Sequence, residues 1–94
     1  MYIDDFLWLP DILEKLAVKH RVIQDEVEEV FFNHPWYRYI EAGHRLGEDV
    51  YAALGQTDTG RYLIVFFIHK PENVALVLSA RDMDKMERKQ YERK

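Results

Sequence analysis

The chain has 94 residues, which is enough for one domain, and we place that domain at residues 1–94. It carries a formal net charge of −4. Because it contains no cysteine, a disulfide framework, a thiolate zinc site and a cysteine nucleophile are excluded. The longest apolar run, residues 62–68, is far shorter than the ~20 residues that cross a membrane, and we expect a cytoplasmic protein.

Two helices are predicted before the first strand. Residues 10–20 begin with Pro10, which suits a first helical turn because its missing N–H would be unpaired there. Residues 24–32 form the second helix, and it ends before Pro35 because the residue preceding a proline avoids the α region. In both segments, apolar residues recur at helical spacing, which indicates one buried face on each helix.

Four strands and a final helix follow. The helix covers residues 84–93, and Asp82 or Asp84 can cap it. The third strand is apolar on both faces, so we expect it in the centre of the sheet. Short turns between successive strands imply antiparallel neighbours. The predicted fold is α+β, with two N-terminal helices, an antiparallel meander of three to four strands and a C-terminal helix; the strands are residues 36–40, 48–56, 61–69 and 74–80.

The two N-terminal helices have the spacing of a helix-turn-helix, which raises DNA recognition as one interpretation. The second helix, however, carries Asp25, Glu26, Glu28 and Glu29 and no basic residue. Attraction to phosphate supplies most of the non-specific affinity for DNA, so these four acids oppose it. We therefore expect no direct DNA binding by this unit.

No metal or cofactor site is expected. The glycine-rich nucleotide-binding motifs and the HExxH zinc motif are absent. The four histidines fall on different predicted elements without a chelating spacing: His20, His34, His44 and His69.

A group of polar residues is predicted to meet at one end of the sheet. Arg61 opens the central strand and Arg81 closes the last one, and in an antiparallel meander these positions lie at the same end. The final helix follows Arg81 and brings a carboxylate, a guanidinium and a phenol to that end. With an imidazole, such a set suits phosphoryl chemistry on RNA, because arginine binds phosphate bidentately and histidine titrates near neutrality. The added residues are His20, Glu87, Arg88 and Tyr91.

The same residues have a second interpretation. Arg61 and Arg81 can be solvated charges at strand ends, and Glu87 with Arg88 part of an exposed helix. His20 then stands at a helix C-terminus, where the dipole favours a cation.

Three aromatic residues on the first predicted strand suggest a partner-binding surface: Trp36, Tyr37 and Tyr39. That strand is expected at an edge of the sheet, where unpaired backbone groups can accept another chain. Alternatively, the rings only cover the face of the sheet.

An ordered series of short motifs resembles the BrnT toxin family. The series spans nearly the whole chain and consists of Lys19-His20-x-Val22, Glu26-Val27-x-x-Val30-Phe31, Gly47-Glu48-Asp49-x-Tyr51-Ala52-x-Leu54-Gly55-x-Thr57, Gly60-Arg61 and Ser79-Ala80-Arg81-x-Met83-x-x-x-Glu87-Arg88-x-x-Tyr91. One departure is Arg21, which stands where the family usually has glycine.

The resemblance implies the toxin half of a bacterial type II toxin–antitoxin pair. It implies a RelE-like ribonuclease fold, metal-independent cleavage of RNA that inhibits translation, and neutralisation by a ribbon-helix-helix antitoxin. We therefore predict that His20, Arg61, Arg81 and Tyr91 are catalytic and that Lys19, Glu87 and Arg88 bind RNA. The alternative is a non-catalytic interaction module that retains the toxin fold and its partner surface.

Overall fold

The computed structural model describes residues 1–94 and contains three helices and five strands. The predicted elements are present in the predicted order, with ends shifted by one or two residues. The first predicted helix finishes as a turn of π-helix. In chain order the elements are β1 (Asp5–Leu7), α1 (Pro10–Lys15), the π-helical turn η1 (Leu16–His20), α2 (Gln24–Phe32), β2 (Trp36–Glu41), β3 (Val50–Gln56), β4 (Tyr62–Lys70), the 3-10 turn η2 (Pro71–Asn73), β5 (Val74–Asp82) and α3 (Lys85–Arg93).

The strands form one sheet in the order β1-β5-β4-β3-β2. Strands β2 to β5 pair antiparallel with their neighbours in the chain, so the predicted meander is confirmed. Strand β4 lies in the centre, also as predicted, and β2 lies at one edge.

The prediction of a purely antiparallel sheet of three to four strands is wrong, because β1 adds a fifth strand. It pairs parallel with the first half of β5, which makes the sheet mixed. The Asp4 N–H donates to the Asn73 carbonyl (2.8 Å) and begins this pairing. The Phe6 ring then packs edge-on against Phe31 with ring centres 5.1 Å apart. A strand of three residues is too short to show an alternating pattern, so it left no recognisable signal in the sequence.

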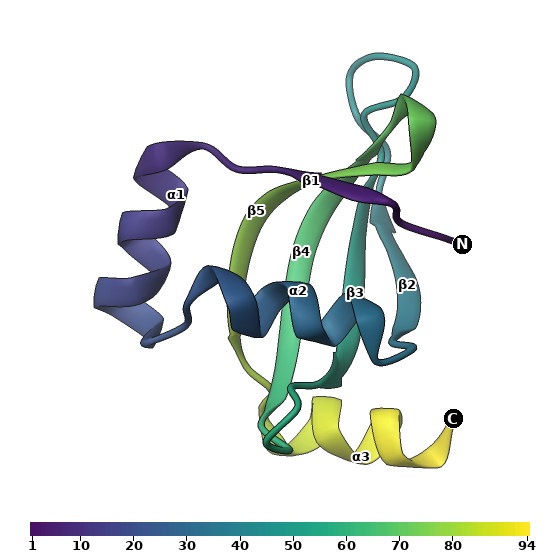
Figure 1. Cartoon of the computed structure of the whole chain (residues 1–94). Helices are drawn as coiled ribbons and strands as arrows, with labels where there is room; N and C mark the ends of the chain where they lie inside the picture. Colours follow the sequence, from purple (N-terminus) through teal and green to yellow (C-terminus); the bar gives the residue numbers. More distant parts are fainter.

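The two faces of the sheet are covered differently. One, which we call the α2 face, carries Leu63, Val65 and Phe67 of β4 and packs against η1 and α2 in a core of 13 buried residues. The other, which we call the α3 face, carries Ile64 of β4 and packs against Tyr91 of α3. Figure 1 shows α2 crossing the front of the sheet and α3 running beneath its lower end.

Helix α2 is a packing element. Val27 and Val30 are fully buried in the core. Its acids also hold other segments, since Trp8 Nε1 donates to Glu28 (3.0 Å) and the Asp58 N–H donates to Glu29 (3.0 Å). These contacts give the acidic side chains a structural role, and the absence of DNA binding stays a prediction.

Helix α3 begins with a reciprocal capping box. The Glu87 N–H donates to Asp84 Oδ1 (2.8 Å), and the Asp84 N–H donates to Glu87 Oε1 (2.9 Å). Asp84 is therefore the cap, and Asp82 is left for another contact.

No helix in the structure is long and apolar enough to cross a membrane.

Candidate functional site

The hairpin between β3 and β4 fixes the position of Arg61. The Thr57 N–H donates to the Arg61 carbonyl (2.9 Å), and the Arg61 N–H donates to the Thr57 hydroxyl (3.0 Å). Gly60 has φ of 93°, a left-handed conformation that glycine adopts without steric cost. Arg61 therefore leaves the turn in a fixed direction, on the α2 face.

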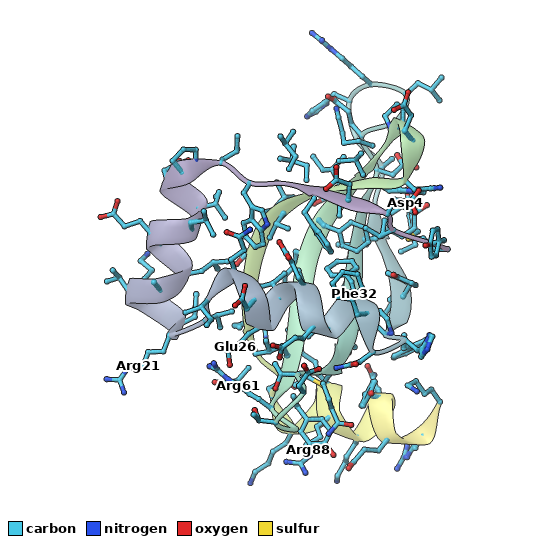
Figure 2. All side chains as sticks on the ribbon, in the orientation of Figure 1. Asp4, Arg21, Glu26, Phe32, Arg61 and Arg88 are labelled. Atoms are coloured by element: carbon cyan, nitrogen blue, oxygen red, sulfur yellow. The ribbon has the colours of Figure 1, made fainter.

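The Arg61 guanidinium joins three segments that are distant in the sequence. Its Nε donates to Asp82 Oδ1 (2.8 Å), and its Nη1 donates to Glu26 Oε1 (3.1 Å). It also donates to the carbonyls of His20 (3.0 Å) and Arg21 (2.8 Å), which end the first helix. We call Glu26, Arg61 and Asp82, with the His20 and Arg21 carbonyls, the Arg61 cluster; Figure 2 shows Arg61 beside Glu26 below α2.

The Arg61 guanidinium is fully engaged within the Arg61 cluster, where it faces two carboxylates. All three guanidinium nitrogens donate to oxygens of this chain, and the carbonyls at the helix C-terminus gain the donors that the helix lacks. The hydrogen bond and the charge of Arg61 lower the pKa of Asp82 below its ordinary value of 3.8. His20 is half-buried, and its backbone carbonyl, which accepts from Arg61, ties it to this network.

The turn after η1 has a strained conformation. Arg21 has φ of 52° and ψ of 41°, the left-handed region that normally favours glycine. The N–H groups of Arg21 and Val22 both reach the Leu16 carbonyl, as in a helix C-cap. Lys19 and Arg21 are exposed on either side of His20, and in Figure 2 the Arg21 side chain extends away from the body of the protein.

Arg81 lies at the same end of the sheet as Arg61, as predicted, but on the other face. It is paired with Ile64, whose side chain lies on the α3 face, while Asp82 is paired with Leu63 on the α2 face. The Arg81 guanidinium donates bidentately to Glu87 (2.7 and 2.8 Å) and lies over the Phe66 ring. The two arginines therefore do not converge on one point, because adjacent residues of β5 point to opposite faces.

The Arg81–Glu87 pair predicts a specific loss of stability in acid. The hydrogen bond from Arg81 lowers the pKa of Glu87 below its ordinary value of 4.5, so ionised Glu87 stabilises the folded state. That stabilisation is present above the ordinary value and is lost as the pH falls through the lowered pKa. We expect Glu87→Gln to lower the free energy of unfolding at pH 7 by about 1 kcal/mol and to flatten its fall below pH 4.5.

The measurement is urea unfolding at pH values from neutral to strongly acidic. Glu92→Gln is the matched control, because Glu92 is half-exposed and its nearest cation, Arg88, is 3.7 Å away. A Glu87→Gln profile parallel to that of the wild type would contradict the assigned role of the pair.

The remaining residues of the predicted site lie on α3. The Arg88 guanidinium stacks over the Tyr62 ring at 3.9 Å, and the Tyr62 and Tyr91 rings meet edge-on with centres 5.9 Å apart. Burial raises the pKa of Tyr91, and neighbouring Tyr62 adds to the rise, so Tyr91 stays a neutral phenol at physiological pH. Four cations against two acids between Lys85 and Arg93 make α3 a basic border of this end.

The three aromatic residues predicted to bind a partner lie on the edge strand β2 but do not share one face. Trp36 packs on the α3 face, and Tyr37 is half-buried on the α2 face against Phe31 and Phe67. Only Tyr39 is widely exposed (53 %). Trp36 and Tyr37 are less accessible than Tyr39, and the role of the three residues in partner binding stays a prediction.

The structure contains no group of three or more histidine, aspartate or glutamate side chains arranged to hold a metal ion.

Comparison with known proteins gives the family. A family model described as "Ribonuclease toxin, BrnT, of type II toxin-antitoxin system" matches residues 8–87. The chain belongs to the BrnT family. Membership implies an antitoxin partner, because the family is the toxin of type II toxin–antitoxin systems.

A solved structure agrees with the BrnT assignment. The chain resembles the 1.1 Å crystal structure of the Brucella abortus ribonuclease toxin BrnT with a TM-score of 0.64, covering 86 % of this chain and 97 % of that chain. The two sequences are 17 % identical, so this likeness establishes the fold alone. A comparison with curated protein sequences gave no match.

Within this BrnT chain, sequence reasoning missed the acids that engage Arg61. In the sequence, Glu26 stands out only as one of four acids on the second helix and as part of a family motif, and Asp82 only as a possible helix cap. Asp82 could have been singled out, because it directly follows Arg81 on the last strand and therefore points to the opposite face. The contact with Glu26 depends on how α2 lies across the sheet, and no local pattern shows that.

Proposed function

We propose that this chain is a metal-independent endoribonuclease toxin that inhibits translation, and that RNA binds at the lower end of the sheet. Membership in the BrnT ribonuclease toxin family over residues 8–87 carries the proposal. The site is supported by the position of His20, which is half-buried beside the Arg61 cluster and is preceded and followed in the sequence by an exposed cation.

In the proposed reaction the RNA 2′-hydroxyl attacks the adjacent phosphorus. The bond from phosphorus to the 5′-oxygen breaks, which leaves a cyclic phosphate on one product and a 5′-hydroxyl on the other. His20 takes the proton from the 2′-hydroxyl and returns a proton to the leaving oxygen. We assign proton transfer to His20 rather than Tyr91, because Tyr91 packs on the α3 face and its raised pKa keeps it a phenol.

The contacts of the two predicted catalytic arginines favour positioning roles. Arg61 holds the backbone of His20 and Arg21 and uses its nitrogens in doing so. Arg81 holds Glu87 and thereby the start of α3. We assign phosphate binding to Lys19 and Arg21, which are exposed and whose side chains make no ion pair in the structure. Such cations can stabilise the negative charge that develops on the phosphate.

For the antitoxin we propose a ribbon-helix-helix protein that binds along the edge strand β2. Its unpaired edge and the exposed ring of Tyr39 support this location. The competing proposal is a non-catalytic module that kept the fold. It is supported by Arg61, whose three guanidinium nitrogens all donate to oxygens of this chain.

Expression of the chain alone tests the proposed function. We expect growth arrest and a fall in amino-acid incorporation, both reversed by the antitoxin. His20→Ala, at the same soluble level, is expected to relieve both effects, because it removes the proton-transfer group. His44→Ala is the matched control, since His44 is exposed in the loop before β3. Normal growth with soluble wild-type protein would favour the non-catalytic module.

A further inference from the structure

A polar pocket of about 490 Å³ lies between the β3–β4 hairpin, the end of α2 and the last turns of α3, and the reaction proposed above does not use it. The pocket is an open hollow on the surface rather than an enclosed cavity. Its lining is almost entirely polar, with one aromatic ring: Asn33, Gln56, Thr57, Asp58, Gly60 and Tyr91.

The internal hydrogen bonds of the pocket leave mainly acceptors available. Asn33 Nδ2 donates both to the Gln56 backbone carbonyl and to Asp58 Oδ1 (3.0 Å each). The side-chain oxygen of Asn33 accepts no hydrogen bond within the chain. Gln56 Nε2 donates to the Gly60 carbonyl (3.3 Å), which leaves the Gln56 side-chain oxygen free. The second carboxylate oxygen of Asp58 also makes no hydrogen bond within the chain.

These acceptors select a ligand that presents several N–H donors. A carboxylate accepts best from two adjacent N–H groups, and among the RNA bases only guanine presents such a pair on its Watson–Crick edge. Tyr91 contributes the one aromatic side chain of the pocket wall; its ring packs on the α3 face and has Lys94 over it. We propose that this pocket binds a guanine base, with Asp58 accepting from its N1–H and its exocyclic amine.

The position of the pocket links it to the proposed cleavage site, and in this respect the inference rests on the proposed function. Thr57 lines the pocket and also fixes Arg61 through two backbone contacts. Lys94 Nζ lies 4.6 Å from the centre of the Tyr91 ring, and Arg88 stacks on neighbouring Tyr62. A base in the pocket would therefore have cations beside it for its phosphates.

The test uses the four neutral ribonucleosides, because they carry no phosphate and their binding does not depend on RNA cleavage. Guanosine, adenosine, cytidine and uridine are titrated into the labelled wild-type chain and followed by NMR. We expect guanosine to shift the signals of Asp58, its hairpin neighbours and the Asn33 side-chain amide. Its affinity should exceed that of the other three by about tenfold, the size of one bidentate base contact.

Asp58→Asn is the decisive variant. Its side-chain oxygen can still accept from Asn33, so the hairpin is expected to fold, while an amide donor replaces the free carboxylate oxygen. Guanosine should then lose its advantage, whereas Asp25→Asn, which changes an exposed acid at the start of α2, should retain it.

Equal binding of all four nucleosides, no binding of any, or an unchanged preference in Asp58→Asn would each overturn the guanine pocket. Guanosine binding by a chain that does not cut RNA would instead overturn the proposed ribonuclease activity and leave the pocket intact.

Discussion

Replacing His20 with alanine is expected to slow RNA cleavage by about 10²–10⁴-fold, the usual contribution of a positioned general acid–base group. His20 ends η1, and its backbone carbonyl accepts from Arg61, so its place is set by the main chain and survives truncation of the side chain. The variant should therefore unfold at nearly the same urea concentration as the wild type, which separates a chemical role from a structural one.

The measurement is the single-turnover cleavage rate of a labelled RNA by purified proteins. His44→Ala, carried through the same purification, controls for the loss of a histidine and for contaminating nucleases. A His20→Ala rate equal to that of the wild type would remove His20 from the mechanism and would return Tyr91 as the proton-transfer candidate.

Replacing Arg61 with alanine is expected to lower the free energy of unfolding by about 2–3 kcal/mol. This is the usual cost of removing the donor from hydrogen bonds that involve a charged group. The variant leaves the Glu26 carboxylate, 22 % exposed, without its cation and two helix-end carbonyls without their donor. Asp82 adds little to this loss, because its side chain is 64 % exposed and water replaces the contact.

Urea denaturation measures this change. Arg61→Lys should recover only part of the stability, because an ammonium lacks the planar fork that reaches Asp82, Glu26 and both carbonyls together. Arg45→Ala removes the same charge from an exposed loop position and should change stability by less than about 0.5 kcal/mol. An Arg61→Ala midpoint equal to that of Arg45→Ala would show that the Arg61 cluster does not hold the fold together.

Much of the fold could be predicted from the sequence, because its signals are local. The apolar run of β4 indicated a central strand, and Gly60 with its neighbours indicated the hairpin that leads into it. The short β1 could not be predicted, since its three residues pair with a strand about 70 positions away and show no alternation.

The candidate site could be predicted only in part. Meander topology placed Arg61 and Arg81 at one end of the sheet, and this is where they lie. Their faces depend on register, and a bulge between the partners of Phe66 and Phe67 shifts the register of β5, which no sequence pattern reveals. The partners of Arg61 likewise depend on tertiary packing.

Cleavage of RNA by the purified chain in the presence of excess chelator tests the central claim most directly. A defined single-stranded RNA is incubated with the wild type and, in parallel, with His20→Ala prepared identically. We expect the wild type to produce fragments with cyclic phosphate and 5′-hydroxyl ends, and His20→Ala to leave the RNA intact over the same time. Intact RNA with folded wild-type protein, or identical fragments from both proteins, would contradict the assignment of a metal-independent ribonuclease site at this end of the sheet.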